Sequence, residues 1–165
     1  MGSQAIPAAA REVRASLDAI RRIVRLLRES SGAAQRRAGV SGAQLFVLQQ
    51  LKAGAALSLR DLAERTATHE SSVSVVVQRL VDAGLVARKE SARDGRRLEL
   101  SLLPPGRALL RRAPPLAQEK LLAALEQLDA RDRRALARSL TALVAGLGLA
   151  AQPPEMFFEE RRRAR

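Results

Sequence analysis

Hydrophobic side chains recur every three to four residues over most of this chain, which is the spacing of a helix that buries one face. The first such stretch covers residues 8 to 30 and predicts one long helix with arginines on its other faces. Small and flexible residues at 30–42 then predict a loop. The hydrophobic positions of this first helix are Val13, Leu17, Ile20, Val24 and Leu27.

Two capping boxes mark the starts of the next two helices. In a capping box, a serine side chain accepts a hydrogen bond from the backbone three residues later, and the side chain at that later position returns one. Ser41 with Gln44 predicts a helix that ends near Gly54. Ser58 with Asp61 predicts a short third helix after it.

The fourth predicted helix follows Thr68, which can cap it, and Gly84 stops it. At about 100° per residue, its hydrophobic side chains gather on one side, which should pack inward. These are Val73, Val76, Val77 and Leu80. The other side carries the polar residues Ser71, Ser74, Gln78 and Arg79, with Ser72 at its edge. Val75 breaks the pattern because it falls among the polar group.

After this helix the period of the pattern changes to two, which is typical of half-buried strands. Leucines alternate with polar residues at 98–102, and the segment 85–90 can form the partner strand. Between them, Asp94–Gly95 is a strong signal for a hairpin turn. Positions 88–97 hold five basic and two acidic side chains, so the predicted hairpin is positively charged.

Helical spacing returns after Pro104 and Pro105 and continues to residue 147, with Asp129 marking a break between two helices. The final segment, 153–165, is charged and begins with two prolines, so we expect it to be poorly ordered. The pattern as a whole predicts a mainly α-helical fold with one small β-hairpin.

Composition narrows the chemistry of the chain. Lys and Arg number 29 against 17 Asp and Glu, and the net charge of +12 favours a polyanionic partner, with nucleic acid ranked before an anionic membrane. No cysteine and one histidine exclude thiolate chemistry and histidine-rich metal clusters. Without a phosphate loop or clustered carboxylates, we expect no catalytic residues, no metal, no cofactor and no enzyme.

The sequence also predicts where the protein works. No apolar run approaches the roughly 20 residues of a membrane span. The first residues lack the basic start and apolar stretch of a signal peptide. We therefore expect a cytoplasmic protein with no membrane partner.

A short helix, a tight turn at 66–68, a second helix and a basic hairpin together predict a helix-turn-helix followed by a wing. The second helix of such a unit lies in the major groove of DNA. There, the apolar side chain of Val75 can contact a thymine methyl group. The alternative is a tolerated surface valine, since single exposed apolar residues are ordinary. The polar neighbours of Val75 favour the DNA interpretation.

The remaining DNA contacts are predicted from the same helix and from the hairpin. Serine and glutamine side chains can contact base edges or phosphates, and arginine can contact phosphate or guanine. On the hairpin, Arg93 and Arg96 are expected to contact phosphates or the minor groove, with Arg93 at the tip. The predicted contacts on the helix are Ser71, Ser72, Ser74, Val75, Gln78 and Arg79.

The motifs between residues 41 and 112 resemble, in their order, the winged-helix core of MarR-type transcriptional regulators. The matching elements are the DLAERT helix, the RLVDAGLV exit of the fourth helix, the RDGR wing and the final PPGRALL. The resemblance implies a homodimer that binds a pseudo-palindromic operator in double-stranded DNA, usually as a repressor. It also implies release by a small effector, commonly an anionic aromatic molecule, held between the dimerisation and DNA-binding regions.

The resemblance divides the chain into four parts. Residues 1–40 and 104–148 are expected to form the N- and C-terminal dimerisation helices, 41–103 the winged helix-turn-helix domain, and 149–165 a charged tail. Val75 lies where many members carry a polar or basic residue, so the operator contact there should differ. The effector and its pocket stay open, because the Cys, His-rich and Trp sensors of some members are missing.

Two alternatives stay open on the sequence alone. A net charge of +12 also permits a non-specific nucleic-acid-binding or chromosome-packing protein. His69 could contact phosphate, line a ligand pocket or respond to pH, or it could be a partly exposed residue with no special role.

Overall fold

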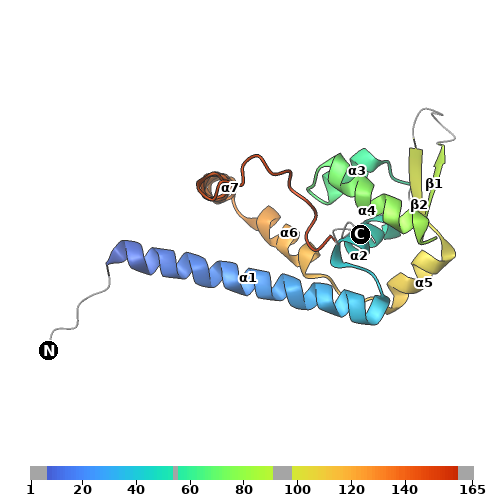
Figure 1. Ribbon diagram of the computed structural model, residues 1–165, viewed down its shortest axis with the longest axis horizontal. Coiled ribbons are helices and arrows are strands. Elements are labelled where there is room, and N and C mark those ends of the chain that lie inside the picture. Colours follow the sequence, from blue (N-terminus) through green and yellow to red (C-terminus); the bar gives the residue numbers. More distant parts are fainter. Residues whose placement is uncertain (1–6, 54–55, 91–97, 160–165) are drawn as a thin grey trace.

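The computed structural model describes residues 7–53, 56–90 and 98–159, and its fold is mainly α-helical with one two-stranded antiparallel sheet, as predicted. In Figure 1, α1 extends away from a body formed by the helices α2 to α5 and the hairpin, and α7 stands apart from that body. The elements are α1 (Ala8–Ala38), α2 (Gly42–Gln50), the 3-10 helix η1 (Leu51–Ala53), α3 (Leu59–Arg65), α4 (Glu70–Asp82), β1 (Val86–Glu90), β2 (Leu98–Leu102), α5 (Pro104–Arg112), α6 (Ala117–Gln127) and α7 (Ala130–Gly146).

The hydrophobic core lies where α2, α3, α4 and the base of the hairpin meet. Its members are almost all aliphatic, and each fully buried side chain of this size contributes roughly 1.5–3 kcal/mol to folding. Phe46 is buried among them. The largest fully buried leucines are Leu45, Leu48, Leu62, Leu80, Leu100 and Leu116.

The predicted capping boxes are both present. Ser41 Oγ accepts from the N–H of Gln44, and the Gln44 side chain accepts from the N–H of Ser41. Ser58 and Asp61 make the same reciprocal pair at the start of α3. Because these bonds satisfy backbone donors within four residues, they set where each helix begins without help from the rest of the fold.

The first helix is longer than predicted. The segment 30–38 was expected to belong to a loop, but α1 continues through it to Ala38 and ends at Gly39, which has a φ of 72°. Ala34 and Ala38 are buried against the body, and contacts between α1 and α2 stabilise the helical conformation there. Small residues that permit a loop also permit close helix packing, and the local pattern does not distinguish the two.

Several hydrogen bonds fix the turn between α3 and α4. Thr66 Oγ1 donates to the carbonyl oxygen of Leu62 at 2.7 Å, and its own N–H donates there too, at 2.9 Å. Ala67 takes a positive φ of 49°, and the N–H of Thr68 donates to Ala63 at 2.9 Å. The predicted cap at Thr68 is wrong by one residue: His69 is the N-cap of α4, and its side chain makes no capping bond.

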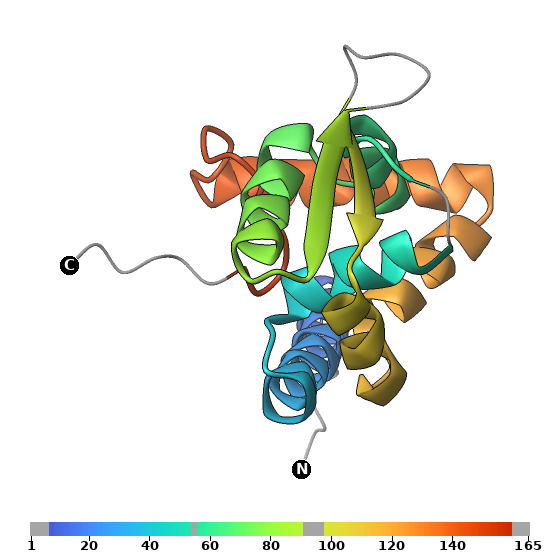
Figure 2. The ribbon, with the colours of Figure 1, turned by 90° about the vertical axis from the view of Figure 1, so that its right-hand side faces the viewer.

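The two strands pair in an antiparallel register in which Val86 faces Leu102 and Glu90 faces Leu98. Leu57 adds a short bridge to Leu100 through two backbone hydrogen bonds. Leu100 is fully buried, but Leu98 is 45% exposed, because the hairpin leaves the helical body before that position. Figure 2 shows the two strands side by side, in front of the helices in that view. The predicted turn at Asp94–Gly95 lies outside the described residues.

The C-terminal segment differs from the prediction. We expected 153–165 to be poorly ordered, yet residues 153–159 fold back onto the body and Met156 is only 6% exposed. The predicted break at Asp129 is confirmed, since its carboxylate accepts from the N–H groups of Arg131 and Asp132 and caps α7. Residues 160–165 lie outside the described part of the chain.

Gly106 sits where α5 begins and approaches the backbone that joins α4 to β1. A Cβ at this position would lie 2.3 Å from the carbonyl oxygen of Leu85, and Leu85 also accepts a backbone hydrogen bond from Leu103. The close approach explains why glycine is needed in the PPGRALL motif. It also ties α5 to the exit of α4.

We therefore expect Gly106→Ala to lower the free energy of unfolding by about 1–3 kcal/mol, because backbone atoms must move to admit the methyl group. Chemical denaturation followed by circular dichroism measures the change. Gly146→Ala is the matched control, because a Cβ there meets nothing within 4 Å. Equal stability of the two variants would contradict the proposed contact.

Candidate nucleic-acid interface

Helix α4 has one buried and one solvent-facing side. Val73, Val76, Val77 and Leu80 are each 0% exposed, while Val75 is 46% exposed. The helical wheel derived from the sequence is therefore confirmed for all five side chains. Val75 leaves apolar surface in contact with water, and no core contact within the described residues accounts for it.

The residues around Val75 are polar and accessible to differing degrees. Ser71 and Gln78 are exposed, whereas Ser72, Ser74 and Arg79 are half-buried. Gln78 Nε2 donates to the carboxylate of Asp82 at 2.8 Å, one turn further along the helix. Serine and glutamine side chains with free lone pairs suit contact with base edges and phosphates.

Packing against α2 and α3 holds this surface in place. The most extensive contacts of α4 are with α2 and α3, and the helix leads directly into β1. The acidic Glu70 occupies its first turn, where the positive end of the helix dipole favours it. A rigid support of this kind is what a recognition surface requires, because its side chains must keep their spacing when the partner binds.

The C-terminal segment lies beside the same surface, which the sequence analysis missed. Ser72 Oγ donates to the carbonyl oxygen of Pro154 at 2.8 Å, and Arg79 Nη1 lies 3.6 Å from Glu159 Oε1. A cavity of about 290 Å³ separates the segment from α4. Its lining residues are Ser71, Ser72, Val75, Arg79, Pro153, Glu155 and Glu159.

Burial raises the pKa of Glu159 above its ordinary value, and the nearby Arg79 guanidinium opposes the rise. Glu155 adds a second carboxylate on the same segment and raises it further. The sequence signal for this docking was the run Met156, Phe157 and Phe158, three large apolar residues inside a segment that is otherwise rich in charge and proline.

The predicted wing contacts are not placed. Arg93 and Arg96 lie outside the described residues, so their proximity to α4 stays a prediction. Within the described part of the hairpin, Lys89 is exposed and Arg88 is half-buried, both on β1. Two of the basic residues predicted for the hairpin therefore lie on β1, the strand that follows α4.

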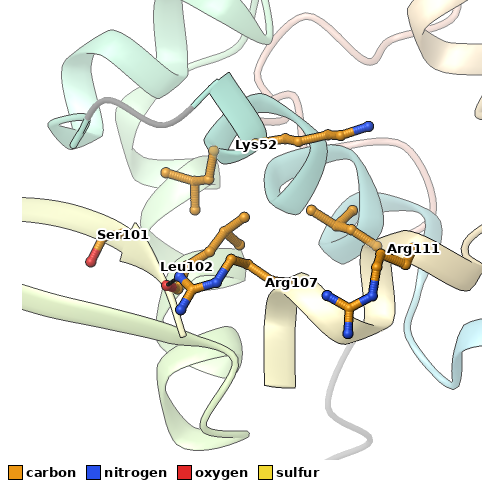
Figure 3. Close-up of a pocket in the computed structure, with 7 residues that line it drawn as sticks. Lys52, Ser101, Leu102, Arg107 and Arg111 are labelled. Carbon is orange, nitrogen blue, oxygen red and sulfur yellow. Dashed lines mark hydrogen bonds between the residues drawn. The ribbon is translucent and has the colours of Figure 1, made fainter. Parts of the chain in front are cut away.

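A cavity of about 330 Å³ lies where η1, β2 and α5 meet (Figure 3). Leu51, Leu102 and Leu110 supply apolar walls, and three basic residues border it: Lys52, Arg107 and Arg111. Figure 3 shows the Arg107 guanidinium turned toward Leu102, whose carbonyl oxygen it contacts, while Lys52 extends away from it. The two arginines make this cavity suited to a small anion with an apolar body.

A second cavity, of about 260 Å³, lies between α2, the turn at 66–68 and α6. Leucines of α6 and Phe46 line it, and residues 154–157 of the C-terminal segment form one wall. Gln118 Nε2 donates to the carbonyl oxygen of Phe157 at 3.1 Å, and Gln118 Oε1 is buried without a partner in the described structure.

The described ranges offer neither a metal site nor a membrane-spanning helix. They contain no group of three or more His, Asp or Glu side chains placed to hold a metal ion. None of their helices is both long enough and apolar enough to cross a membrane.

A short helix, a bonded turn, a second helix with an accessible polar face, and an antiparallel hairpin define a winged helix-turn-helix protein. The chain matches the sequence model of the MarR family over residues 38–97. It is 31% identical over 122 residues to the HTH-type transcriptional repressor Rv2887 of Mycobacterium tuberculosis, a match that covers 74% of this chain and 88% of that repressor. The chain therefore belongs to the MarR family of transcriptional regulators, which are DNA-binding proteins and not enzymes.

One further relative and one solved structure of similar fold extend the comparison. The chain is 40% identical over 68 residues to the HTH-type transcriptional repressor MdtR of Bacillus subtilis. This match covers 41% of this chain and 44%, less than half, of MdtR. A solved structure of an S. aureus MepR mutant bound to an oligodeoxyribonucleotide matches the fold with a TM-score of 0.50 at 20% identity, over 80% of this chain and 97% of that one.

The contrast between neighbouring valines of α4 can be measured. We expect Val76→Ala to lower the free energy of unfolding by about 2 kcal/mol, because it leaves a void in the core. Val75→Ala, the same chemical change one residue earlier on the exposed side, should stay within about 0.5 kcal/mol of the parent. Urea denaturation of both variants distinguishes the two positions, and a large loss for Val75→Ala would place that side chain in the core.

Proposed function

We propose that this protein is a homodimeric transcriptional repressor that lays α4 in the major groove of a pseudo-palindromic operator and is released by a small ligand. The exposed Val75 among polar side chains on a rigidly supported helix carries the proposal. A regulator of this kind works on chromosomal DNA in the cytoplasm.

The chemistry of α4 supports contact with bases. The methyl groups of Val75 can pack against a thymine methyl group, and the serines and Gln78 can contact base edges or phosphates. Arg79 can contact phosphate or guanine, and Arg93 and Arg96 of the hairpin can contact the DNA backbone. The net charge of +12 adds sequence-independent attraction. The MepR structure, in which a protein of this fold is bound to an oligodeoxyribonucleotide, agrees with this use of the fold.

The apolar surface that α1 and α7 expose is an argument for the proposed homodimer. Helix α7 has no buried residue, although Leu136, Leu140 and Leu143 recur along it at helical spacing. The half of α1 that extends from the body in Figure 1 also exposes large apolar side chains, including Val13 and Leu17. Contiguous exposed apolar surface marks an interaction site, and a second copy offers the same two helices to cover it.

The cavity beside Arg107 and Arg111 supports a small effector. Its apolar walls suit an aromatic or aliphatic body, and its arginines suit a carboxylate. It lies where the wing meets α5, so a bound ligand would contact both the DNA-binding region and the helices that follow it. An anionic aromatic molecule combines these features.

Selection of bound DNA from a random pool tests the proposal. We expect one inverted repeat to be enriched, with half-sites about one helical turn apart. Binding to that site should survive an excess of random DNA. Loss of the complex under such competition would instead favour the alternative, a non-specific nucleic-acid-binding or chromosome-packing protein, which the net charge also permits.

Val75→Ser should weaken binding mainly at operators with thymine at one half-site position. The loss should be smaller than the roughly 1–3 kcal/mol of a good bidentate contact, because only methyl contact is removed. Fluorescence anisotropy on duplexes that differ at that position measures it. An equal loss on every sequence would contradict contact with a thymine methyl group.

Arg93→Ala should weaken binding to every sequence to a similar degree, because a phosphate contact carries no base information. The slope of log K against log salt should fall by about one, the value expected for one phosphate contact. Titrations at several salt concentrations give the slope. If affinity and slope both match the parent, the wing does not contact the backbone through this residue.

A further inference from the structure

The segment after α7 returns to the body and ends beside the recognition helix. In Figure 1 it runs from α7 back toward α2 and α4. It crosses the surface that the proposed function assigns to DNA, although the sequence predicts a poorly ordered tail.

Two contacts anchor the segment away from the DNA-facing surface. Met156 is 6% exposed and belongs to the hydrophobic core cluster. The carbonyl oxygen of the next residue, Phe157, accepts a hydrogen bond from Gln118, which is itself buried. These contacts fix the segment between α2 and α6, so its position does not depend on α4 alone.

Two further contacts engage residues that the proposed function assigns to DNA. Ser72 Oγ donates to Pro154, and Arg79 faces the carboxylate of Glu159. The Glu159 side chain is 9% exposed and the Arg79 side chain 27%, so this pair is shielded from water more than an ordinary surface ion pair. Both residues must give up these partners before they can contact a base or a phosphate.

The charge of the segment opposes DNA as well. Glu155 and Glu159 line the same cavity as Val75 and Ser71. A DNA strand in that space would bring its phosphates close to two carboxylates, and like charges at such distances repel. The docked segment therefore places negative charge where the proposed operator would place its own.

We propose that residues 153–159 form an autoinhibitory segment that must leave α4 before operator DNA binds. The inference rests on the proposed function, because it assumes that α4 is the DNA-binding helix. Docked and released forms are in equilibrium, and only the released form presents Ser72 and Arg79 freely. The measured dissociation constant then exceeds the intrinsic one by the reciprocal of the released fraction.

Met156→Asp tests the inference, because a carboxylate cannot be accommodated in the core and the segment should undock. We expect the variant to bind the selected operator duplex about threefold or more tightly than the parent. Gln152→Asp is the matched control: it adds the same charge at an exposed position just before the segment. Fluorescence anisotropy measures both. Binding by Met156→Asp that is no tighter than that of Gln152→Asp overturns the inference.

A second variant avoids any disturbance of the core. Glu159→Gln removes the ion pair with Arg79 and leaves Met156 in place, so it should tighten binding in the same direction but less. Glu126→Gln, which removes one negative charge from an exposed position on α6, controls for the change in net charge. Equal affinities for these two variants would contradict a specific role of Glu159.

Hydrogen exchange gives a readout on the segment itself. In the parent protein, adding the operator duplex should speed amide exchange in residues 155–159, the part of the segment that carries backbone N–H groups. Unchanged exchange in the bound state would overturn the inference. The two proposals fail differently. DNA binding that does not depend on the segment overturns the inference alone, whereas absence of DNA binding in every variant, the released ones included, overturns the proposed function and the inference with it.

Discussion

The burial of one side of α4 is the constraint on which the rest of this protein depends. Val73, Val76, Val77 and Leu80 are removed from water by α2 and α3, and this burial leaves only one orientation for the opposite side. Val75 and its polar neighbours face outward as a consequence of that packing, because a helix cannot rotate about its axis without exposing four apolar side chains. The surface assigned to DNA is thus positioned by the core, and its own residues are free to differ without loss of the fold.

The same helix couples the core to the hairpin. Hydrogen bonds at Thr66 and the positive φ of Ala67 set the angle at which α4 leaves α3. At its other end, Leu85 accepts from Leu103, and Gly106 allows α5 to approach within contact of that carbonyl oxygen. Helix α4, the base of the wing and the first turn of α5 therefore form one packed unit. A ligand in the cavity beside Arg107 would act on that unit directly.

The proposed dimerisation and DNA binding both depend on surfaces that the single chain leaves exposed. The exposed apolar side chains of α1 and α7 suit the proposed second copy of the chain, and the polar side of α4 suits a polyanion. The segment 153–159 is the exception, since it covers part of the α4 surface from within the same chain. Its docking depends on one buried methionine, a few hydrogen bonds and one ion pair, and interactions of this size can be exchanged for contacts with DNA.

The sequence by itself determined the features that depend on neighbouring residues: the capping boxes at Ser41 and Ser58, the two sides of α4, the strand alternation that buries Leu100, and the start of α7 at Asp129. Each of these is governed by side chains within one or two turns, so a local pattern suffices. Only the tertiary structure decided that 30–38 is helical, that Leu98 leaves the core and that Met156 enters it. These outcomes depend on contacts between residues far apart in the chain, such as Gln118 with Phe157 and Ser72 with Pro154, and no periodicity records which distant surface a segment will meet.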